Sequence, residues 1–152
     1  MRIQSGKVFI ASIAALLSLA SWGFASNHHS LNGTWILLPT RSNFGGEPVI
    51  QSGTVTIKDS DRNIYMSRNF TYEGANQTVT YQFATDGREN SSIRQGKSFK
   101  SKAKWDDNVL KVTTVGDAVT EHESYSLTVD GTMMLVVERP GHAPVTLYLE
   151  RR

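Results

Sequence analysis

The prediction of the fold class starts from the stretch Leu31-Asn32-Gly33-Thr34-Trp35-Ile36-Leu37-Leu38. It is the first run with the character of a β-strand, and Pro39 ends it, because proline lacks the N–H that a strand ladder needs. The triplet Gly33-Thr34-Trp35 opens the strand. We expect the strands that follow to pair one after another until the last of them returns to this first one.

Alternation of apolar and polar residues continues along the rest of the chain, and helical periodicity is almost absent after residue 30. Short connections rich in Gly, Asp and Pro separate the alternating runs, and such links join antiparallel neighbours. Among them, Asp86-Gly87 predicts a tight hairpin, because glycine tolerates a positive φ. The predicted strands are Gly33 to Leu38, Gly53 to Lys58, Asn63 to Tyr72, Gln77 to Thr85, Ser91 to Arg94, Ser98 to Trp105, Val109 to Val115, Val119 to Val129, Thr132 to Glu138 and Val145 to Arg151.

A meander of this kind leaves two exposed edges unless the first and last strands meet. Closure into a barrel removes those edges. The sequence therefore predicts an all-β fold, an antiparallel up-and-down β-barrel of about 8–10 strands. A β-sandwich is the alternative, although its Greek-key crossovers usually need longer connections.

The amino-terminal segment, residues 1–25, predicts a secretory signal peptide. Arg2 and Lys7 are its basic residues, Val8 to Ala20 is apolar, and Gly23-Phe24-Ala25 offers small residues at the positions that a signal peptidase reads. A transmembrane anchor is the alternative, but a span needs roughly 20 apolar residues. We therefore expect a secreted or periplasmic protein whose single domain, residues 26–152, has no integral membrane span.

Charge and cysteine content exclude several classes of function. Removing Arg2 and Lys7 from the 16 Lys and Arg residues leaves 14, against 14 Asp and Glu, so the expected mature chain is formally neutral. That balance predicts no nucleic-acid partner. The chain has no cysteine, which excludes disulfides, a thiol nucleophile and thiolate metal ligands.

The triplet Gly33-Thr34-Trp35 at the start of an antiparallel meander resembles the lipocalin pattern. The run from this triplet through Ser42-Asn43-Phe44-Gly45 to Ser52-Gly53-Thr54-Val55-Thr56-Ile57 is similar to small exported bacterial lipocalin-like (calycin-type) proteins. The resemblance implies that Gly33 and Trp35 close one end of the barrel and that a basic side chain, Arg151 or Arg152, covers the Trp. The missing disulfide, the missing C-terminal helix and the strand count also bring the ten-stranded fatty-acid-binding relatives into consideration.

A barrel of this size is filled by side chains or holds one small ligand. The interior-facing positions therefore predict either a lipophilic pocket or a packed core. Arg68 stands out among them, because a buried guanidinium needs a partner. That partner is Glu121, Glu123 or the carboxylate of an acidic ligand, unless a bulge turns Arg68 to solvent. The candidate interior residues are Met66, Arg68, Phe70, Tyr81, Phe83, Phe99, Trp105, Tyr125 and Met133.

No catalytic or metal-binding pattern is present in the sequence. There is no Gly-x-Ser-x-Gly elbow, and Glu121 and Glu123 are the only suggestion of acid–base chemistry. The four histidines lack the spacing of a preorganised metal site, so we expect them on the surface, and we expect no metal and no cofactor.

The sequence thus predicts a non-enzymatic exported protein that carries or sequesters a small hydrophobic or amphipathic ligand. The alternative is a packed barrel that serves as a protein-interaction module through its loops. The candidate loops are Arg41 to Pro48 and Arg139 to Pro144. The oligomeric state and the ligand's identity stay open.

Overall fold

The computed structural model describes residues 28–60, 62–94 and 96–152. The predicted signal peptide, residues 1–25, lies outside these ranges. Within them, the structure contains no helix with the length and apolar character needed to cross a bilayer.

Ten strands and one 3₁₀ turn make up the described part of the chain. Buried and exposed positions alternate along most of them, for the reason that successive side chains of a strand point to opposite faces. The elements are β1 (Gly33–Leu37), η1 (Pro39–Arg41), β2 (Ile50–Ser60), β3 (Asn63–Tyr72), β4 (Ala75–Ala84), β5 (Asp86–Arg94), β6 (Lys97–Asp106), β7 (Val109–Val115), β8 (Thr120–Leu127), β9 (Met133–Glu138) and β10 (Val145–Arg151).

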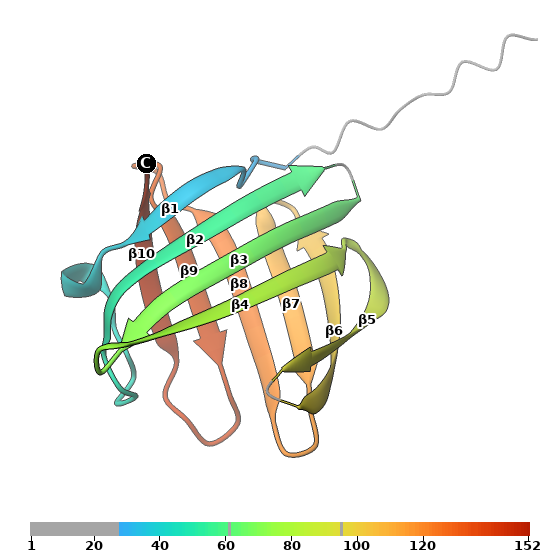
Figure 1. The fold of residues 1–152 in the computed structure, drawn as a ribbon. Coiled ribbons are helices and arrows are strands. Elements are labelled where there is room, and N and C mark those ends of the chain that lie inside the picture. The colour runs from blue at the N-terminus through green and yellow to red at the C-terminus, as the bar shows by residue number, and fades with distance from the viewer. Residues whose placement is uncertain (1–27, 61, 95) are drawn as a thin grey trace, which may run out of the picture.

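All ten strands belong to one antiparallel sheet, in the order β4-β3-β2-β1-β10-β9-β8-β7-β6-β5. The sheet curls into a nearly closed barrel, in which β1–β4 form one wall and β6–β10 the other (Figure 1). The predicted up-and-down barrel is therefore confirmed. The alternative of a β-sandwich is wrong, because one continuous sheet wraps around the core.

The first and last strands pair, as the sequence predicts. Trp35 in β1 lies opposite Arg151 in β10, and the Arg151 Cζ lies 4.6 Å from the centre of the Trp35 ring. The Trp35 ring is fully buried, and its Nε1 donates a hydrogen bond to the Leu31 carbonyl oxygen at 2.9 Å. Gly33 has a φ of 136°, a conformation that favours glycine.

The predicted Asp86-Gly87 hairpin is wrong. β4 and β5 are the two edges of the sheet, and they face each other across the unpaired seam of the barrel. Asp86 already pairs with Lys104 of β6, and the register shifts between Asp86 and Glu89. Gly87, with a φ of 81°, lies within this irregularity, so its positive φ serves a bulge in β5 rather than a two-residue turn.

The hydrophobic core fills the end of the barrel beneath Trp35. Its fully buried members come from both walls and contact one another, which leaves this half of the interior packed. The largest of them are Trp35, Tyr125, Phe83, Leu31, Ile57, Ile64, Met66, Leu110, Met133, Leu135 and Leu149.

Candidate functional site

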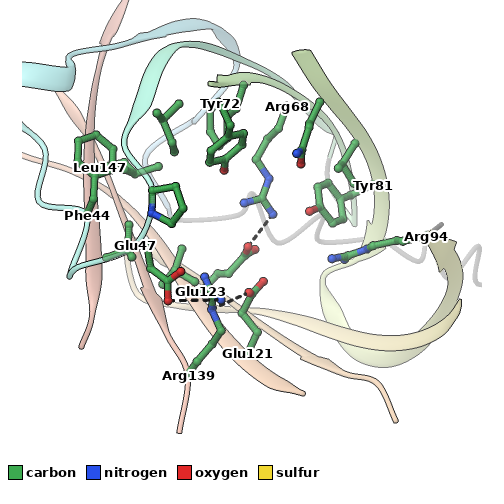
Figure 2. Close-up of a pocket in the computed structure, with 17 residues that line it drawn as sticks. Phe44, Glu47, Arg68, Tyr72, Tyr81, Arg94, Glu121, Glu123, Arg139 and Leu147 are labelled. Atoms are coloured by element: carbon green, nitrogen blue, oxygen red, sulfur yellow. Dashed lines mark hydrogen bonds and ion pairs between the residues drawn. The ribbon is translucent and has the colours of Figure 1, made fainter. Parts of the chain in front are cut away.

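A cavity of about 260 Å³ occupies the other end of the barrel. It lies where β10 begins, at Val145, whereas Trp35 packs against the end of β10 at Arg151. The β7–β8 and β9–β10 connections lie at this end, the lower one in Figure 1. Figure 2 shows charged and aromatic side chains pointing into the cavity from both walls. The interior therefore has a packed half and a hollow half.

Three of the predicted interior residues, Arg68, Phe70 and Tyr81, line this cavity. The others lie outside it. Met66, Phe83, Tyr125 and Met133 are buried in the packed half, and Phe99 and Trp105 are partly buried. Alternation along a strand shows which face a residue occupies but not its depth in the barrel, so the sequence alone could not separate the two groups.

Arg68 and Glu123 form an ion pair inside the barrel. Arg68 Nη2 donates to Glu123 Oε1 at 2.6 Å, and the two side chains are 9% and 2% exposed. The Tyr125 hydroxyl donates to the other carboxylate oxygen of Glu123 at 2.9 Å. Burial alone would raise the pKa of Glu123, but the charge of Arg68 and the hydrogen bonds from Arg68 and Tyr125 lower that pKa. Of the partners that the sequence offers Arg68, the structure selects Glu123.

Glu121 shares the inward face of β8 with Glu123 and lies nearer the mouth. Arg139 Nε contacts its carboxylate at 3.4 Å, and Arg139 Nη1 lies 4.0 Å from Glu47. Burial and the neighbouring charge of Glu123 raise the pKa of Glu121. Glu121, Arg139 and Glu47 thus form a second charged group at the mouth of the cavity. His142 Nδ1 also lies 3.2 Å from the Glu47 carboxylate.

Arg94 extends across the seam from β5 to the wall of β4. Its Cζ lies 4.4 Å from the centre of the Tyr81 ring, and the Arg68 Cζ lies 4.5 Å from the same ring (Figure 2). The Nε atoms of Arg68 and Arg94 are buried and have no hydrogen-bond partner among the described residues. Two guanidinium donors are therefore left unused beside one aromatic ring.

Sequence reasoning missed several residues that line the cavity: Glu47, Tyr72, Arg94 and Arg139. Each of them lies at the end of a strand or just outside one, where alternation is short or interrupted. One sequence feature could have identified such residues: a charged residue near a strand end, at a position where the alternation places side chains inside the barrel. Arg94 shows it, because it shares the phase of the half-buried Ser92 while Ile93 points outward.

The two loops suggested as a protein-interaction surface contact each other at the cavity mouth. Asn43 pairs with Thr146 in an isolated bridge, and a Cβ on Gly45 would lie 2.7 Å from the Pro144 carbonyl oxygen. Glu47 and Arg139 from these loops also line the cavity. The two loops therefore contribute to the lining of the cavity.

The expectation of four surface histidines is wrong for His28. Its ring stacks on Trp105 with 3.6 Å between the centroids, and its side chain is 7% exposed. His28 Nε2 donates to Asp59 Oδ2 at 2.8 Å. No group of three or more potential metal-ligating His, Asp or Glu side chains occurs in the described ranges.

Comparison with known proteins identifies the fold. No protein-family model matches the sequence, and no curated protein matches it. The REP1-NXSQ fatty acid transporter is similar in structure, with a TM-score of 0.64 and 20% identity over 80% of this chain and 96% of that one. Human cRBP IV gives a TM-score of 0.63 at 17% identity, over 82% of this chain and 99% of that one. A mutant of the fluorescent protein UnaG gives 0.61 at 17% identity, over 80% of this chain and 96% of that one.

At these identities the likeness concerns the fold. The resemblance that Gly33-Thr34-Trp35 suggests is confirmed at that level, and the described part of the chain forms a ten-stranded sheet. The chain has the calycin-type β-barrel fold that fatty-acid-binding and lipocalin-like proteins share.

Proposed function

We propose that this chain is an exported, non-enzymatic binding protein that holds one small amphipathic molecule in the cavity at the open end of the barrel. The ligand's anionic group lies beside Arg68 and Arg94, and its apolar part lies against the lining residues Phe44, Phe70 and Val79. One observation carries the proposal: two buried guanidinium Nε donors without partners in the described chain border a cavity that also has an apolar wall.

The unused donors favour an anionic ligand. A buried donor without an acceptor costs about 1–3 kcal/mol, and a hydrogen bond to a charged group is worth about 1.5–3 kcal/mol. A carboxylate or similar anion between Arg68 and Arg94 would satisfy both Nε atoms. Planar anions suit the guanidinium fork, which Tyr81 already holds in place by stacking.

The size of the cavity favours a compact ligand. Its volume of about 260 Å³ lies just below the range of roughly 300–1,000 Å³ that is usual for small-molecule sites. The packed half beneath it leaves no room for a long chain to extend toward Trp35. We therefore expect a short-chain or medium-chain molecule.

The two glutamates on β8 support binding rather than catalysis. Glu123 is engaged by Arg68 and Tyr125, and Glu121 contacts Arg139, so both carboxylates are already held by protein groups. The fatty acid transporter among the structural neighbours is named for carriage of an amphipathic acid, which agrees with this proposal. Export follows from the predicted removal of residues 1–25 and belongs to the same proposal.

The test compares two ligands that differ only in charge. We expect decanoate to bind with one molecule per chain, measured by isothermal titration calorimetry, and decanol to bind more weakly. Arg94→Gln removes one guanidinium and should weaken decanoate binding by about 10-fold to 100-fold, because one charge-assisted hydrogen bond is worth about 1.5–3 kcal/mol. Decanol binding should change little.

Arg88→Gln is the matched control, because Arg88 lies on the same strand with its side chain 74% exposed. It should leave the affinity for decanoate unchanged. If Arg94→Gln and Arg88→Gln behave alike, the anion does not lie at Arg94. If neither decanoate nor decanol binds, the cavity is not a site for amphipathic molecules.

A further inference from the structure

We propose that the cavity takes up its anionic ligand together with a proton, which the Glu121 carboxylate holds. This inference rests on the proposed function, because it concerns the anion that lies beside Arg68 and Arg94. It adds a means of regulating that site. The ligand binds more tightly as the surroundings become acidic and is released as they return toward neutrality.

The charged side chains that line the cavity cancel one another. Three arginines and three glutamates are present, so the lining is formally neutral before a ligand enters. An added anion leaves an excess negative charge, which is costly inside the barrel because charges interact more strongly where the dielectric constant is low. Uptake of a proton by one of the glutamates would restore neutrality. The six residues are Arg68, Arg94, Arg139, Glu47, Glu121 and Glu123.

Two of the three glutamates are poorly placed to take that proton. Glu123 accepts hydrogen bonds from Arg68 at 2.6 Å and from Tyr125 at 2.9 Å. Burial acts to raise the pKa of Glu123, but the charge of Arg68 and these hydrogen bonds lower that pKa overall. Glu47 lies at the mouth with its side chain 31% exposed, where solvent screens its charge from the interior.

Glu121 is the glutamate that suits the proton. Its side chain is 21% exposed, and its carboxylate lies 3.4 Å from Arg139 Nε. Burial and the charge of Glu123 raise the pKa of Glu121, against the attraction of Arg68. When protonated, Glu121 donates a hydrogen bond to Glu123, so the two carboxyl groups on the inward face of β8 can share one proton (Figure 2).

Two tyrosines and one histidine are the other titratable groups that the described residues place around this part of the cavity. Tyr72 and Tyr81 come from the opposite wall, and burial raises the pKa of both, so they stay neutral at physiological pH. His142 is 56% exposed and contacts Glu47. Because an imidazole ordinarily changes charge between about pH 5 and pH 8, His142 is the rival source of any pH dependence.

The sign of the pH dependence follows from the extra proton in the complex. An anion between Arg68 and Arg94 raises the pKa of Glu121 further, because a nearby like charge disfavours the ionised form. The affinity is therefore highest below the pKa that Glu121 has in the free protein, and it falls as the pH rises through the pKa in the complex. A further increase of about one pKa unit corresponds to about a 10-fold change in affinity.

The test uses decyl sulfate, because it stays ionised in this pH range, whereas decanoate would take up protons itself. By isothermal titration calorimetry, we expect decyl sulfate to bind at least about 10-fold more tightly at about pH 5 than at about pH 8. Titration in two buffers that differ in ionisation enthalpy counts the protons taken up. Between these pH values we expect at least about half a proton per ligand.

Glu121→Gln mimics the protonated carboxyl group. We expect this variant to bind decyl sulfate at the higher pH as tightly as the parent does at the lower pH, and to take up no proton. Glu150→Gln is the matched control, because Glu150 is exposed on β10 and is not among the residues that line the cavity. Both Glu150→Gln and His142→Gln should keep the pH dependence of the parent.

Two results would overturn this inference while the proposed function stands. The first is equal affinity of the parent for decyl sulfate at both pH values, which would show that no proton accompanies the anion. The second is a pH dependence that persists in Glu121→Gln and disappears in His142→Gln, which would assign the proton to the mouth. Absence of binding by decyl sulfate and decanoate at both pH values would overturn the proposed function and this inference together.

Discussion

Arg68 lies between Met66 and Phe70 on the inward face of β3, and only 8% of it is exposed. Its position on an apolar face is visible in the sequence, because the alternation along that strand is regular. Its partner is not visible there, because Glu121 and Glu123 have the same phase on β8. Only the depth of each carboxylate in the closed barrel decides between them, and depth depends on the register of strands far apart in sequence.

The buried ion pair predicts a characteristic double-mutant cycle. Arg68→Met leaves the Glu123 carboxylate buried without its cation, and Glu123→Leu leaves the Arg68 cation without its anion. Each single change should destabilise the protein by about 3–5 kcal/mol, whereas the double variant should be close to the parent or more stable. Urea unfolding followed by circular dichroism gives the free energy of unfolding for all four proteins.

Additive effects of the two substitutions would contradict the buried ion pair between Arg68 and Glu123. If the losses from the two single changes simply add in the double variant, Arg68 and Glu123 are not coupled in solution. Arg41 and Asp130 provide a comparison pair, because their atoms lie 3.5 Å apart and their side chains are 48% and 58% exposed. A cycle on that exposed pair should give a coupling below about 1 kcal/mol.

At the scale of the elements, the local sequence pattern was sufficient to predict the strands. It was not sufficient to predict that β4 and β5 do not pair. β3, β7 and β10 have the bounds that alternation predicts, because each is flanked by turn-forming residues. Asp86-Gly87 has the chemistry of a hairpin turn, yet β4 and β5 diverge after it. Thr85 N donates to the Arg62 carbonyl oxygen at 2.8 Å, and Asp86 pairs with β6, so non-local pairing overrides the local preference.

The seam predicts uneven protection of backbone amides. β4 pairs with β3 on one side only, so its amides that point toward β5 lack a ladder partner, and Arg94 crosses the gap through its side chain. In hydrogen exchange measured by NMR, alternate amides of β4 should exchange much faster than those of β3, which has partners on both sides. Uniform protection along β4 equal to that of β3 would show that the seam is closed in solution.

At the scale of the whole molecule, the sequence predicts the barrel and the pairing of its ends but leaves open whether the interior is packed or hollow. In the structure, the interior is packed at one end of the barrel and hollow at the other. The apolar residues that fill the end beneath Trp35 and the charged residues of the mouth have the same inward phase, so their separation appears only when the strands are set side by side. Function is therefore expected to depend on one half of the barrel and stability mainly on the other.

Trp35 provides the test of that division. Its ring is fully buried, hydrogen-bonded to Leu31 and covered by Arg151, so Trp35→Ala should lower the free energy of unfolding by about 3–5 kcal/mol. Trp105, which is only partly buried, should cost less when it is changed to Ala. Trp35 does not line the cavity, and effects at separated sites couple by no more than about 0.5 kcal/mol. The folded variant should therefore bind decanoate within roughly twofold of the parent. A variant that keeps full stability would refute the closure of the barrel by Trp35, and one that folds but loses binding would show that the packed end and the cavity act as a single unit.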